Sequence, residues 1–533
     1  MRVGVALLLI GAGEIAQMLS RPCRRGSAPI VLLLPTESVT RASTGTPELV
    51  RDPRCMGTIC MYFLYSVLSA AGMFLLAPYF LAKCLFVKGL RQRYLRNLPE
   101  RFGLRFPSSL GAAPHDAGGG AFKRAQGAIW LHAVSVGEVL AAVPLARSLA
   151  KNHPEKRLVI STTTLTGQEL AHQRMNFADT ILYFPMDWRW AIRRTFRAVR
   201  PDLVIVCETE IWPNFLHEAR RLGVPVIFVN GRISNRSFLR FSRALRFSAG
   251  LLRGFLRRVL NDATLYLMQS EQDRLRVVAL GAETKHVFVT GNVKYDVALP
   301  GPSALCGWLA AEVARSGRSP VLVAGSVIAG EESAVLEALD IVTQRWPGAL
   351  LVMAPRKPER FDAAAAIIES TRRHAVRRSD LSLDGRPSDA SVTCRPGPLS
   401  IVPGALGSVL LLDTIGELAG LYALADAVFI GGSIEPAGGH NPLEPAAFGK
   451  VPVFGSWMDN FRDIAGALLA ADAAIQVSSG AELGAAWTAL LADDVRRERM
   501  GQAARELIDR HRGATAATLD HISALLTGAR VRS

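Results

Sequence analysis

The sequence predicts an α/β protein of two doubly wound domains that face a cleft. From about residue 128 onward, short apolar runs alternate with helical segments, the pattern of a parallel sheet with helices on both faces. The 533 residues exceed what one hydrophobic core usually serves. A stretch that is partly rich in Pro, Gly and Ser separates two such series. The predicted domains are therefore residues 89–299 and 320–533, joined by a linker at 300–319.

Each predicted strand is a short apolar run bounded by turn residues. In the first domain the strands are Ala128–Ala133, Leu158–Ser161, Leu203–Cys207, Val224–Val229, Leu265–Met268 and Val287–Thr290. In the second domain they are Pro320–Ala324, Ala349–Ala354, Val409–Leu412, Ala427–Ile430 and Val451–Phe454. A helix from Glu138 to Ala150, with a kink expected at Pro144, follows the first strand. Residues 108–127 and 380–408 are predicted as surface loops.

The N-terminal region contains two atypical segments. Residues 1–55 show no clear period, and Met56 and Met61 lie just before the next clear element, so we expect translation to start there. Cys60 to Ala82 carries no charge and just spans a hydrocarbon layer of about 30 Å. Basic residues follow at once and place the rest of the chain in the cytoplasm. Residues 56–88 are therefore predicted as a membrane anchor. It either spans the membrane or lies in its surface; a signal peptide and a core helix are the rival interpretations.

The composition limits the classes of partner. The net charge of +16 favours an anionic lipid or a phosphorylated substrate, and no zinc-finger spacing or aromatic-basic motif supports nucleic acid. Seven scattered cysteines without C-x-x-C argue against a disulfide framework and a structural zinc site.

Ligands of parallel α/β sheets bind beyond the carboxyl ends of the strands, so the polar residues there are the candidate site. In the first domain these residues are Ser135–Glu138, Thr162–Thr164, Glu208–Glu210, Asn230–Arg232 and Gly291–Lys294. In the second domain they are Gly325–Ser326, Pro355–Lys357, Asp413–Glu417 and residues 431–444. Together they describe a cleft with carboxylates on one wall and anion-binding loops on the other.

The stretch 431–444 is a Gly-rich loop between a predicted buried strand and a short helix. Asn441 is a good N-cap residue, and Pro442 suits the first helical position. Such a helix start at the end of a strand can bind phosphate, although an ordinary capped turn explains the residues equally well. The loop is neither G-x-G-x-x-G nor a P-loop, so it does not predict a dinucleotide or an ATPase site.

The segment Gly231 to Asn261 contains no acidic residue. Its arginines and its apolar residues gather on different helical faces, which predicts either a membrane-facing helix or a globular helix with a solvated basic face. Gly250 and Gly254 are expected to break it.

Several strings together resemble one enzyme family. They are HAVSVGE, ETEIWPN, NGRISNRS, TGNVKYD, MAPRKPERF, DTIGEL and GGHNPLEPAAFG. In order and spacing they resemble the 3-deoxy-D-manno-octulosonic acid (Kdo) transferases of Gram-negative bacteria, from about Met61 to about residue 520. The resemblance implies a GT-B glycosyltransferase with two Rossmann-like domains and an N-terminal anchor. It also implies inverting transfer of Kdo from CMP-Kdo to the lipid A precursor at the cytoplasmic face of the inner membrane.

The resemblance assigns roles to individual residues. Glu138 resembles the general base, while Glu208 and Lys294 resemble transition-state stabilisers. From the residues alone, Ser135-x-x-Glu138 is better explained as a capping box, and a helix start lowers the pKa of a carboxylate. For Glu208 the alternative is a polar strand end, and for Lys294 a solvated lysine. The positions that resemble the CMP-binding site are Pro355, Arg356, Ile415, Gly416, Glu417, Asn441, Pro442, Leu443 and Glu444.

Arg232, Arg236, Arg240 and Arg243 are the predicted contacts to acceptor phosphates and to an anionic membrane surface. The resemblance implies that no metal and no other cofactor is needed. Two other functions remain open at this point. One is a GT-B lipid glycosyltransferase with a different nucleotide sugar, and the other is a catalytically inactive, membrane-bound nucleotide-binding protein.

Overall fold

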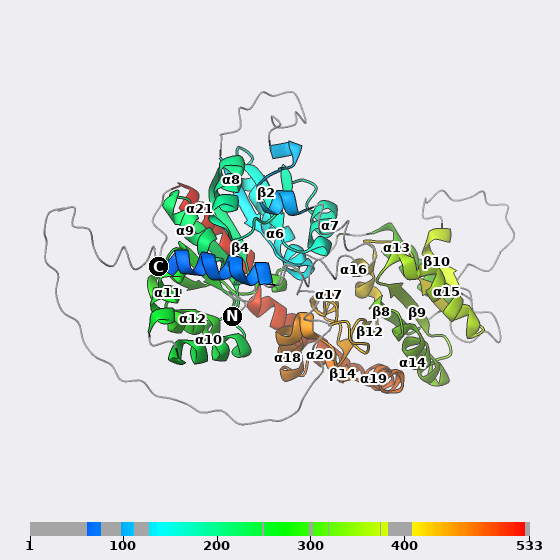
Figure 1. Ribbon diagram of the computed structural model, residues 1–533. Coiled ribbons are helices and arrows are strands. Elements are labelled where there is room, and N and C mark those ends of the chain that lie inside the picture. Colours follow the sequence, from blue (N-terminus) through cyan, green and yellow to red (C-terminus); the bar gives the residue numbers. More distant parts are fainter. Residues whose placement is uncertain are drawn as a thin grey trace, which may run out of the picture. The chain divides into compact units, whose positions relative to one another are not determined.

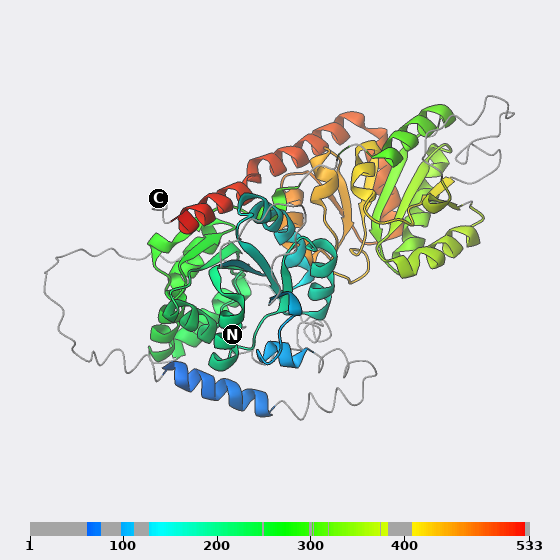
Figure 2. The same cartoon turned by 90° about the horizontal axis from the view of Figure 1, so that it is seen from above.

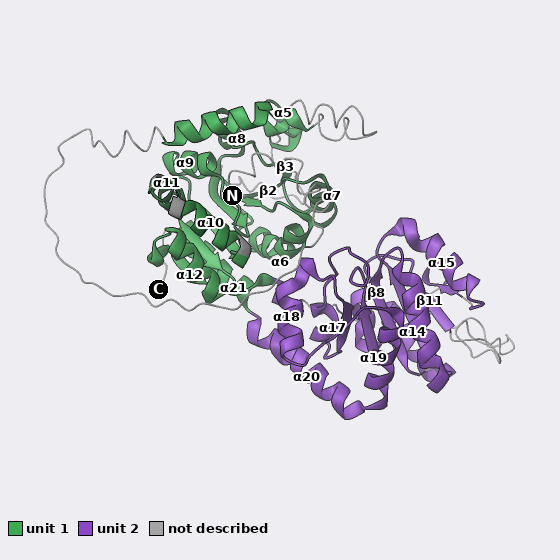
Figure 3. Ribbon diagram, turned by 60° about the horizontal axis from the view of Figure 1, so that its bottom comes forward, with its two compact units in different colours: residues 1–293, 513–533 green, residues 294–512 purple. Residues whose placement is uncertain are grey.

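The structure is a computed structural model that describes residues 61–75, 97–110, 127–247, 250–297, 301, 303–317, 319–373, 375–381 and 408–527. The predicted extension 1–55 and most of the loops 108–127 and 380–408 lie outside these residues. Figure 3 shows the division of the chain into two compact units, residues 1–293 with 513–533 and residues 294–512.

The first unit is built on a seven-stranded parallel sheet (Figure 1). Its strands are β1 (Ala128–His132), β2 (Arg157–Thr162), β3 (Thr180–Tyr183), β4 (Pro201–Cys207), β5 (Val226–Gly231), β6 (Leu265–Met268) and β7 (Val287–Val289). Their order is β3-β2-β1-β4-β5-β6-β7. Both faces are covered, since Trp130 of β1 joins one hydrophobic core and its neighbour Leu131 joins another. This alternation confirms the predicted doubly wound sheet.

The helices of the first unit pack on these two faces. They are α5 (Leu98–Arg101), α6 (Val136–Asn152), α7 (Leu165–Arg174), α8 (Arg189–Val199), α9 (Pro213–Arg221), α10 (Asn235–Phe247), α11 (Leu251–Leu260), α12 (Glu271–Leu280) and α21 (Ala514–Thr527). The helix predicted over Glu138–Ala150 is confirmed as α6, which continues as one element through Pro144.

The second unit repeats the plan with its own seven-stranded parallel sheet. The strands are β8 (Val321–Val327), β9 (Leu350–Pro355), β10 (Ala375–Arg377), β11 (Ser408–Leu411), β12 (Ala427–Ile430), β13 (Pro452–Gly455) and β14 (Ile475–Val477). Their order is β10-β11-β9-β8-β12-β13-β14. The helices are α13 (Ala304–Ser316), α14 (Glu331–Arg345), α15 (Phe361–Ser370), α16 (Leu418–Leu421), α17 (Leu443–Ala447), α18 (Arg462–Ala470), α19 (Gly480–Ala492) and α20 (Asp494–His511).

Two predicted boundaries need correction. The stretch 300–319 is not merely a linker, because it contains helix α13, whose Leu305 and Leu309 are buried in a core of the second unit. The last helix, α21, was predicted in the second domain but belongs to the first unit, where Ile522 joins the core that α6 covers. Strands β3, β10 and β14 were not predicted; each has only three or four residues.

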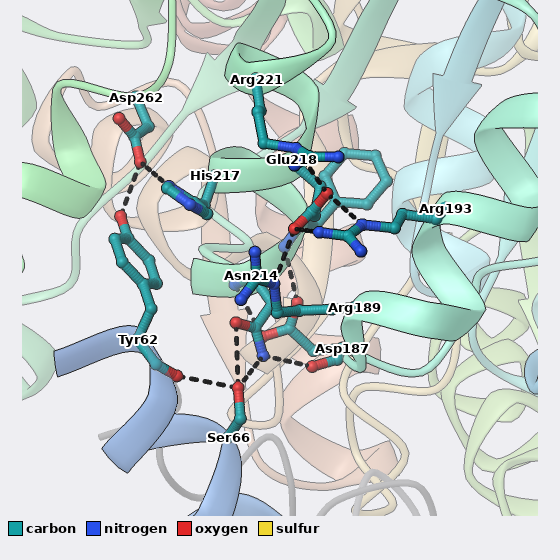
Figure 4. Close-up of polar contacts among 11 residues, drawn as sticks. Tyr62, Ser66, Asp187, Arg189, Arg193, Asn214, His217, Glu218, Arg221 and Asp262 are labelled. Carbon is teal, nitrogen blue, oxygen red and sulfur yellow. Dashed lines mark hydrogen bonds and ion pairs between the residues drawn. The ribbon is translucent and has the colours of Figure 1, made fainter. Parts of the chain in front are cut away.

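Residues 61–75 of the predicted anchor form a helix that lies along the first unit (Figure 2). Figure 4 shows how it is held. The Tyr62 hydroxyl donates to Asp262 at 2.6 Å, and Ser66 and Asn214 exchange hydrogen bonds at 3.0 to 3.2 Å. Tyr65 donates to Asp187 at 2.9 Å. Within the part of the chain that the structure describes, no helix combines the length and the apolar character needed to cross a membrane.

Candidate active site

Each sheet reverses its strand order at one point, and the loops on either side of that point diverge. In the first unit the chain leaves β1 toward β2 and β3 and then returns to place β4 on the other side of β1. In the second unit β8 and β12 stand in the same relation. Ligands of doubly wound sheets bind at such switch points. The segments 133–138 and 208–210 follow β1 and β4, and the Gly-rich loop follows β12.

Glu138 lies in the first turn of α6 and is buried. Its carboxylate accepts hydrogen bonds from the backbone N–H of Val134 at 2.7 Å and from the Ser135 hydroxyl at 3.1 Å. The predicted capping box does not form, because Glu138 accepts from the residue before the N-cap and not from the backbone N–H of Ser135. Ser135 is the N-cap residue, but its side chain makes no capping bond to the backbone and instead holds the carboxylate.

Two further carboxylates surround Glu138. Burial raises the pKa of Glu138 well above its usual value, and the charges of Glu208 and Glu210 raise it further. Burial, followed by the charges of Glu138 and Glu208, also raises the pKa of the Cys207 thiol. The expectation of a lowered pKa at this helix start is wrong, because burial and like charges outweigh two hydrogen bonds. The structure thus brings Glu138 and Glu208 together and adds Glu210, whose role the sequence left open.

The backbone at this edge of the sheet takes an uncommon conformation. Glu208 directly follows β4 and has a φ angle of 57°. Asn230, the last residue but one of the neighbouring strand β5, has a φ angle of 55°. Non-glycine residues in this region cost about 1–3 kcal/mol each and cluster at functional sites. Thr209 exchanges hydrogen bonds with the backbone of Arg232 at 2.8 and 2.9 Å, so Arg232 lies beside the segment 208–210.

Lys294 begins the second unit, in a short 3-10 helix over Val293–Tyr295. Its ammonium lies 5.7 Å from the centroid of the Phe461 ring. Lys294 therefore belongs to a different unit from Glu138 and Glu208.

The donor-side residues predicted from the sequence gather at the carboxyl edge of the second sheet. Pro355 is the last residue of β9. Burial and, to a smaller extent, the charge of Arg356 lower the pKa of the nearby His440 to about 4. Asn441 accepts from the N–H of Leu443 at 3.1 Å and donates to Glu444 at 3.3 Å. The predicted short helix is confirmed as α17, but it begins at Leu443, so Pro442 and not Asn441 is the N-cap residue.

Glu417 is held by a residue that the sequence did not indicate. Arg378 forms hydrogen bonds of 3.0 to 3.2 Å to its carboxylate, and the Thr414 hydroxyl donates to it as well. Gly416 has a φ angle of 100°, which favours glycine, and Ile415 is 67% exposed. No local signal could have found Arg378, because the partners are 39 residues apart in the sequence.

The first part of the Gly-rich loop contacts a side chain of the same protein. The backbone N–H groups of residues 432–435 donate to the buried carboxylate of Glu331, so an internal anion already occupies this part of the loop. The remaining candidates for ligand contact are the residues near the start of α17.

The basic segment forms helices α10 and α11, which break at Gly250 as predicted, whereas Gly254 lies within α11. Phe238, Phe241 and Phe255 pack against a core of the first unit. The apolar face is therefore largely an internal one. Arg240 is half-buried, Arg243 is exposed, and the side chain of Arg236 lies outside the described residues. Among the described residues, no group of three or more His, Cys, Asp or Glu side chains is placed to hold a metal ion.

Sequence comparisons relate the chain to known proteins. A family model described as 3-deoxy-D-manno-octulosonic-acid transferase (kdotransferase) matches residues 96–297. The 3-deoxy-D-manno-octulosonic acid transferase of Haemophilus influenzae is 32% identical over 432 residues, which cover 80% of this chain and 91% of the relative. The enzyme of the same name from Bordetella pertussis is 34% identical over 438 residues, 79% of this chain and 90% of the relative.

A solved structure is also similar to part of the chain. It is the C-terminal CMP-Kdo binding domain of WaaA from Acinetobacter baumannii, with 29% identity, 38% of this chain and 98% of that chain covered, and a TM-score of 0.33.

Two doubly wound units and a carboxylate cluster at a switch point, together with these relatives, define a glycosyltransferase. The chain belongs to the Kdo transferase family, as the relatives with more than 30% identity over nearly their whole length show.

Proposed function

We propose that the protein transfers Kdo from CMP-Kdo to a lipid A precursor, with inversion at the anomeric carbon, at the cytoplasmic face of the inner membrane. The two units would then be the two domains of a GT-B enzyme. The observation that carries the proposal is the burial of Glu138 against Glu208 and Glu210 at the switch point of the first sheet.

The chemistry follows from this cluster. In a single displacement the acceptor hydroxyl attacks the anomeric carbon, the bond to the CMP phosphate oxygen breaks, and CMP leaves with the electron pair. The hydroxyl proton passes to the carboxylate of Glu138. A raised pKa makes this carboxylate a stronger base, and the hydrogen bonds from Val134 and Ser135 fix its direction. Glu208 and Lys294 would stabilise the charges that develop in the transition state.

The donor side of the proposal rests on the second unit. Arg356 would pair with the phosphate of CMP, and Glu444 would accept hydrogen bonds from the ribose hydroxyls. Pro355, Ile415, Gly416, Glu417 and the start of α17 would shape the rest of the nucleotide site. On the acceptor side, Arg232 and the α10 arginines at positions 236, 240 and 243 would contact lipid phosphates.

The experiment is a Kdo transfer assay in detergent with CMP-Kdo generated in place and a bisphosphorylated lipid A precursor. Mass spectrometry follows the product of wild type, Glu138→Gln and Glu482→Gln. Glu482 is a matched control, because it accepts from the Ser478 N–H at 2.7 Å at the start of α19 and is exposed. The proposal expects transfer by wild type and Glu482→Gln and its loss in Glu138→Gln. Turnover of another nucleotide sugar instead, or CMP binding without any turnover, would overturn it in favour of the alternatives.

The helix at residues 61–75 supports the membrane part of the proposal. One side of it is docked through Tyr62, Tyr65 and Ser66, as described above. Large apolar side chains are exposed elsewhere on the same helix, namely Phe63, Leu64, Val67, Leu68, Phe74 and Leu75. Inserting such side chains in the membrane interface would hold the first unit at the lipid surface.

Vesicle flotation tests this part. Phe74 and Leu75 are 84% and 80% exposed, and each large apolar side chain contributes about 1.5–3 kcal/mol when fully buried. Replacing both by Ser should weaken binding to vesicles with anionic lipid by at least about tenfold. Val495→Ser, at a residue 79% exposed in α20, is the control and should bind as wild type does. Equal binding of all three proteins would contradict the proposal.

A further inference from the structure

Glu331 connects two elements that are about a hundred residues apart in the sequence. It is the first residue of α14 and is fully buried, while the loop it meets follows β12. One carboxylate oxygen accepts from the N–H of Gly432 at 2.7 Å and from that of Ile328 at 3.1 Å. The other accepts from Ser433 and Ile434 at 2.9 Å and from Glu435 at 3.4 Å.

Successive backbone N–H groups that converge on one point form an anion-binding concavity. Here that concavity holds a side chain of the same protein. A ligand phosphate brought to the same four N–H groups would meet a buried negative charge, and so this part of the loop is closed to it. The loop must therefore meet its ligand with residues that lie further along, toward α17.

The rest of the loop is tightly packed. A Cβ atom at Gly431 would lie 2.4 Å from the Ser326 carbonyl oxygen, and one at Gly439 would lie 2.3 Å from the sulfur of Met458. The Gly439 N–H donates to the Gly432 carbonyl at 2.6 Å, and Asn460 donates to the Gly438 carbonyl at 2.9 Å. Glu331 fixes the backbone of residues 432–435, and the bond between Gly432 and Gly439 in turn restricts the backbone of residues 438–441.

We propose that Glu331 is a positioning residue for the sugar donor: its buried carboxylate occupies the N–H groups of residues 432–435 and so presents Asn441 to Glu444 to the nucleotide. The inference rests on the proposed function, since it takes this loop as the donor site. Glu331 itself does not touch the donor.

The test compares Glu331→Gln with a matched control, Asp426→Asn. Asp426 accepts from the N–H of Val321 at 2.8 Å, so both variants remove a charge that accepts from the backbone in the second unit. Asp426, however, lies just before β12, at the opposite end of the strand from the Gly-rich loop. We expect Glu331→Gln to raise the Kd for CMP and the KM for CMP-Kdo about tenfold, the change that loss of roughly one hydrogen bond to a charged group produces. The KM for the acceptor should stay unchanged, and Asp426→Asn should alter neither constant.

Hydrogen exchange gives a second readout that needs no substrate. The amides of residues 432–435 should exchange faster in Glu331→Gln than in wild type, and they should be unchanged in Asp426→Asn. If Glu331→Gln does not fold, Glu331→Asp keeps the charge on a shorter side chain, and the same pattern is expected with smaller changes.

The outcomes separate the two proposals. If wild type does not bind CMP, the proposed function is wrong, whatever the exchange rates show. If wild type binds CMP and the Glu331 variants bind it equally well, the positioning role is overturned while the function stands. Equal losses for donor and acceptor would also overturn it, since they indicate a general structural role.

Discussion

The starts of α6 and α19 carry the same local motif and have different chemistry. Each has Ser at the N-cap and Glu three residues later, Ser135 with Glu138 and Ser479 with Glu482. In each, the glutamate accepts at 2.7 Å from the N–H of the residue before the cap. Only at α19 does the serine also cap the backbone, by accepting from the Glu482 N–H at 3.2 Å.

The pKa values of the two carboxylates are shifted in opposite directions. Hydrogen bonds from Ser478 lower the pKa of the exposed Glu482, whereas burial and then Glu208 and Glu210 raise that of Glu138. The motif fixes where a carboxylate stands relative to its helix, but the surroundings that the fold supplies decide whether it can act as a base. Glu138 has these surroundings because β1 and β4 are neighbours at the switch point.

The largest test of this comparison is the loss of the base itself. Glu138→Gln should lower kcat by about 10²- to 10⁴-fold, the usual contribution of a positioned acid or base. Glu482→Gln removes a charge with the same backbone contact and should leave kcat unchanged. CMP binding, measured by calorimetry, should be unaltered in both, because neither residue lies among the donor-side residues. A kcat near that of wild type for Glu138→Gln would show that its role ends at the helix start.

Much of this architecture could be predicted from the sequence. The alternation of apolar runs gave the central strands of both sheets, and the polar residues after them gave Glu138, Glu208 and the loop before α17. Strand order was not predictable from local pattern, and the position of Glu210 beside Glu138 depends on it. Glu331 and Arg378 were not predicted for the same reason. Each is an ordinary charged residue whose partner lies far along the chain, and only the folded structure joins them.

A smaller effect should come from the neighbouring charge. Glu210→Gln removes one of the two carboxylates that raise the pKa of Glu138. The base must be ionised to accept a proton, so activity falls as the pH falls through its pKa. Lowering that pKa should move the acid limb of the kcat profile to lower pH and reduce the plateau, because a weaker base transfers protons less readily.

The matched control for that profile is Glu169→Gln, an exposed position on α7. Its acid limb should coincide with that of wild type. If Glu210→Gln leaves the limb in place, or moves it to higher pH, another group controls the limb.

The smallest effect concerns stability. Removing the charge of Glu138 and removing that of Glu482 should change the melting temperature in opposite directions. A carboxyl whose folded pKa is raised contributes stability that is present below the unfolded pKa and is lost as the pH rises through the folded pKa. At pH 8 Glu138→Gln should therefore melt at a higher temperature than wild type, and the gain should shrink toward pH 4. Glu482 has a lowered pKa, so its contribution is present above the unfolded pKa and is lost as the pH falls. Glu482→Gln should melt slightly below wild type at pH 8, with the difference vanishing in acid.

Calorimetric melting of both variants at pH 8 and pH 4 tests this expectation. A gain at Glu138 paired with a loss of transfer would mean that the fold bears the cost of a buried charge for the sake of the reaction. A lower melting temperature for both variants would mean that both glutamates only stabilise their helix starts.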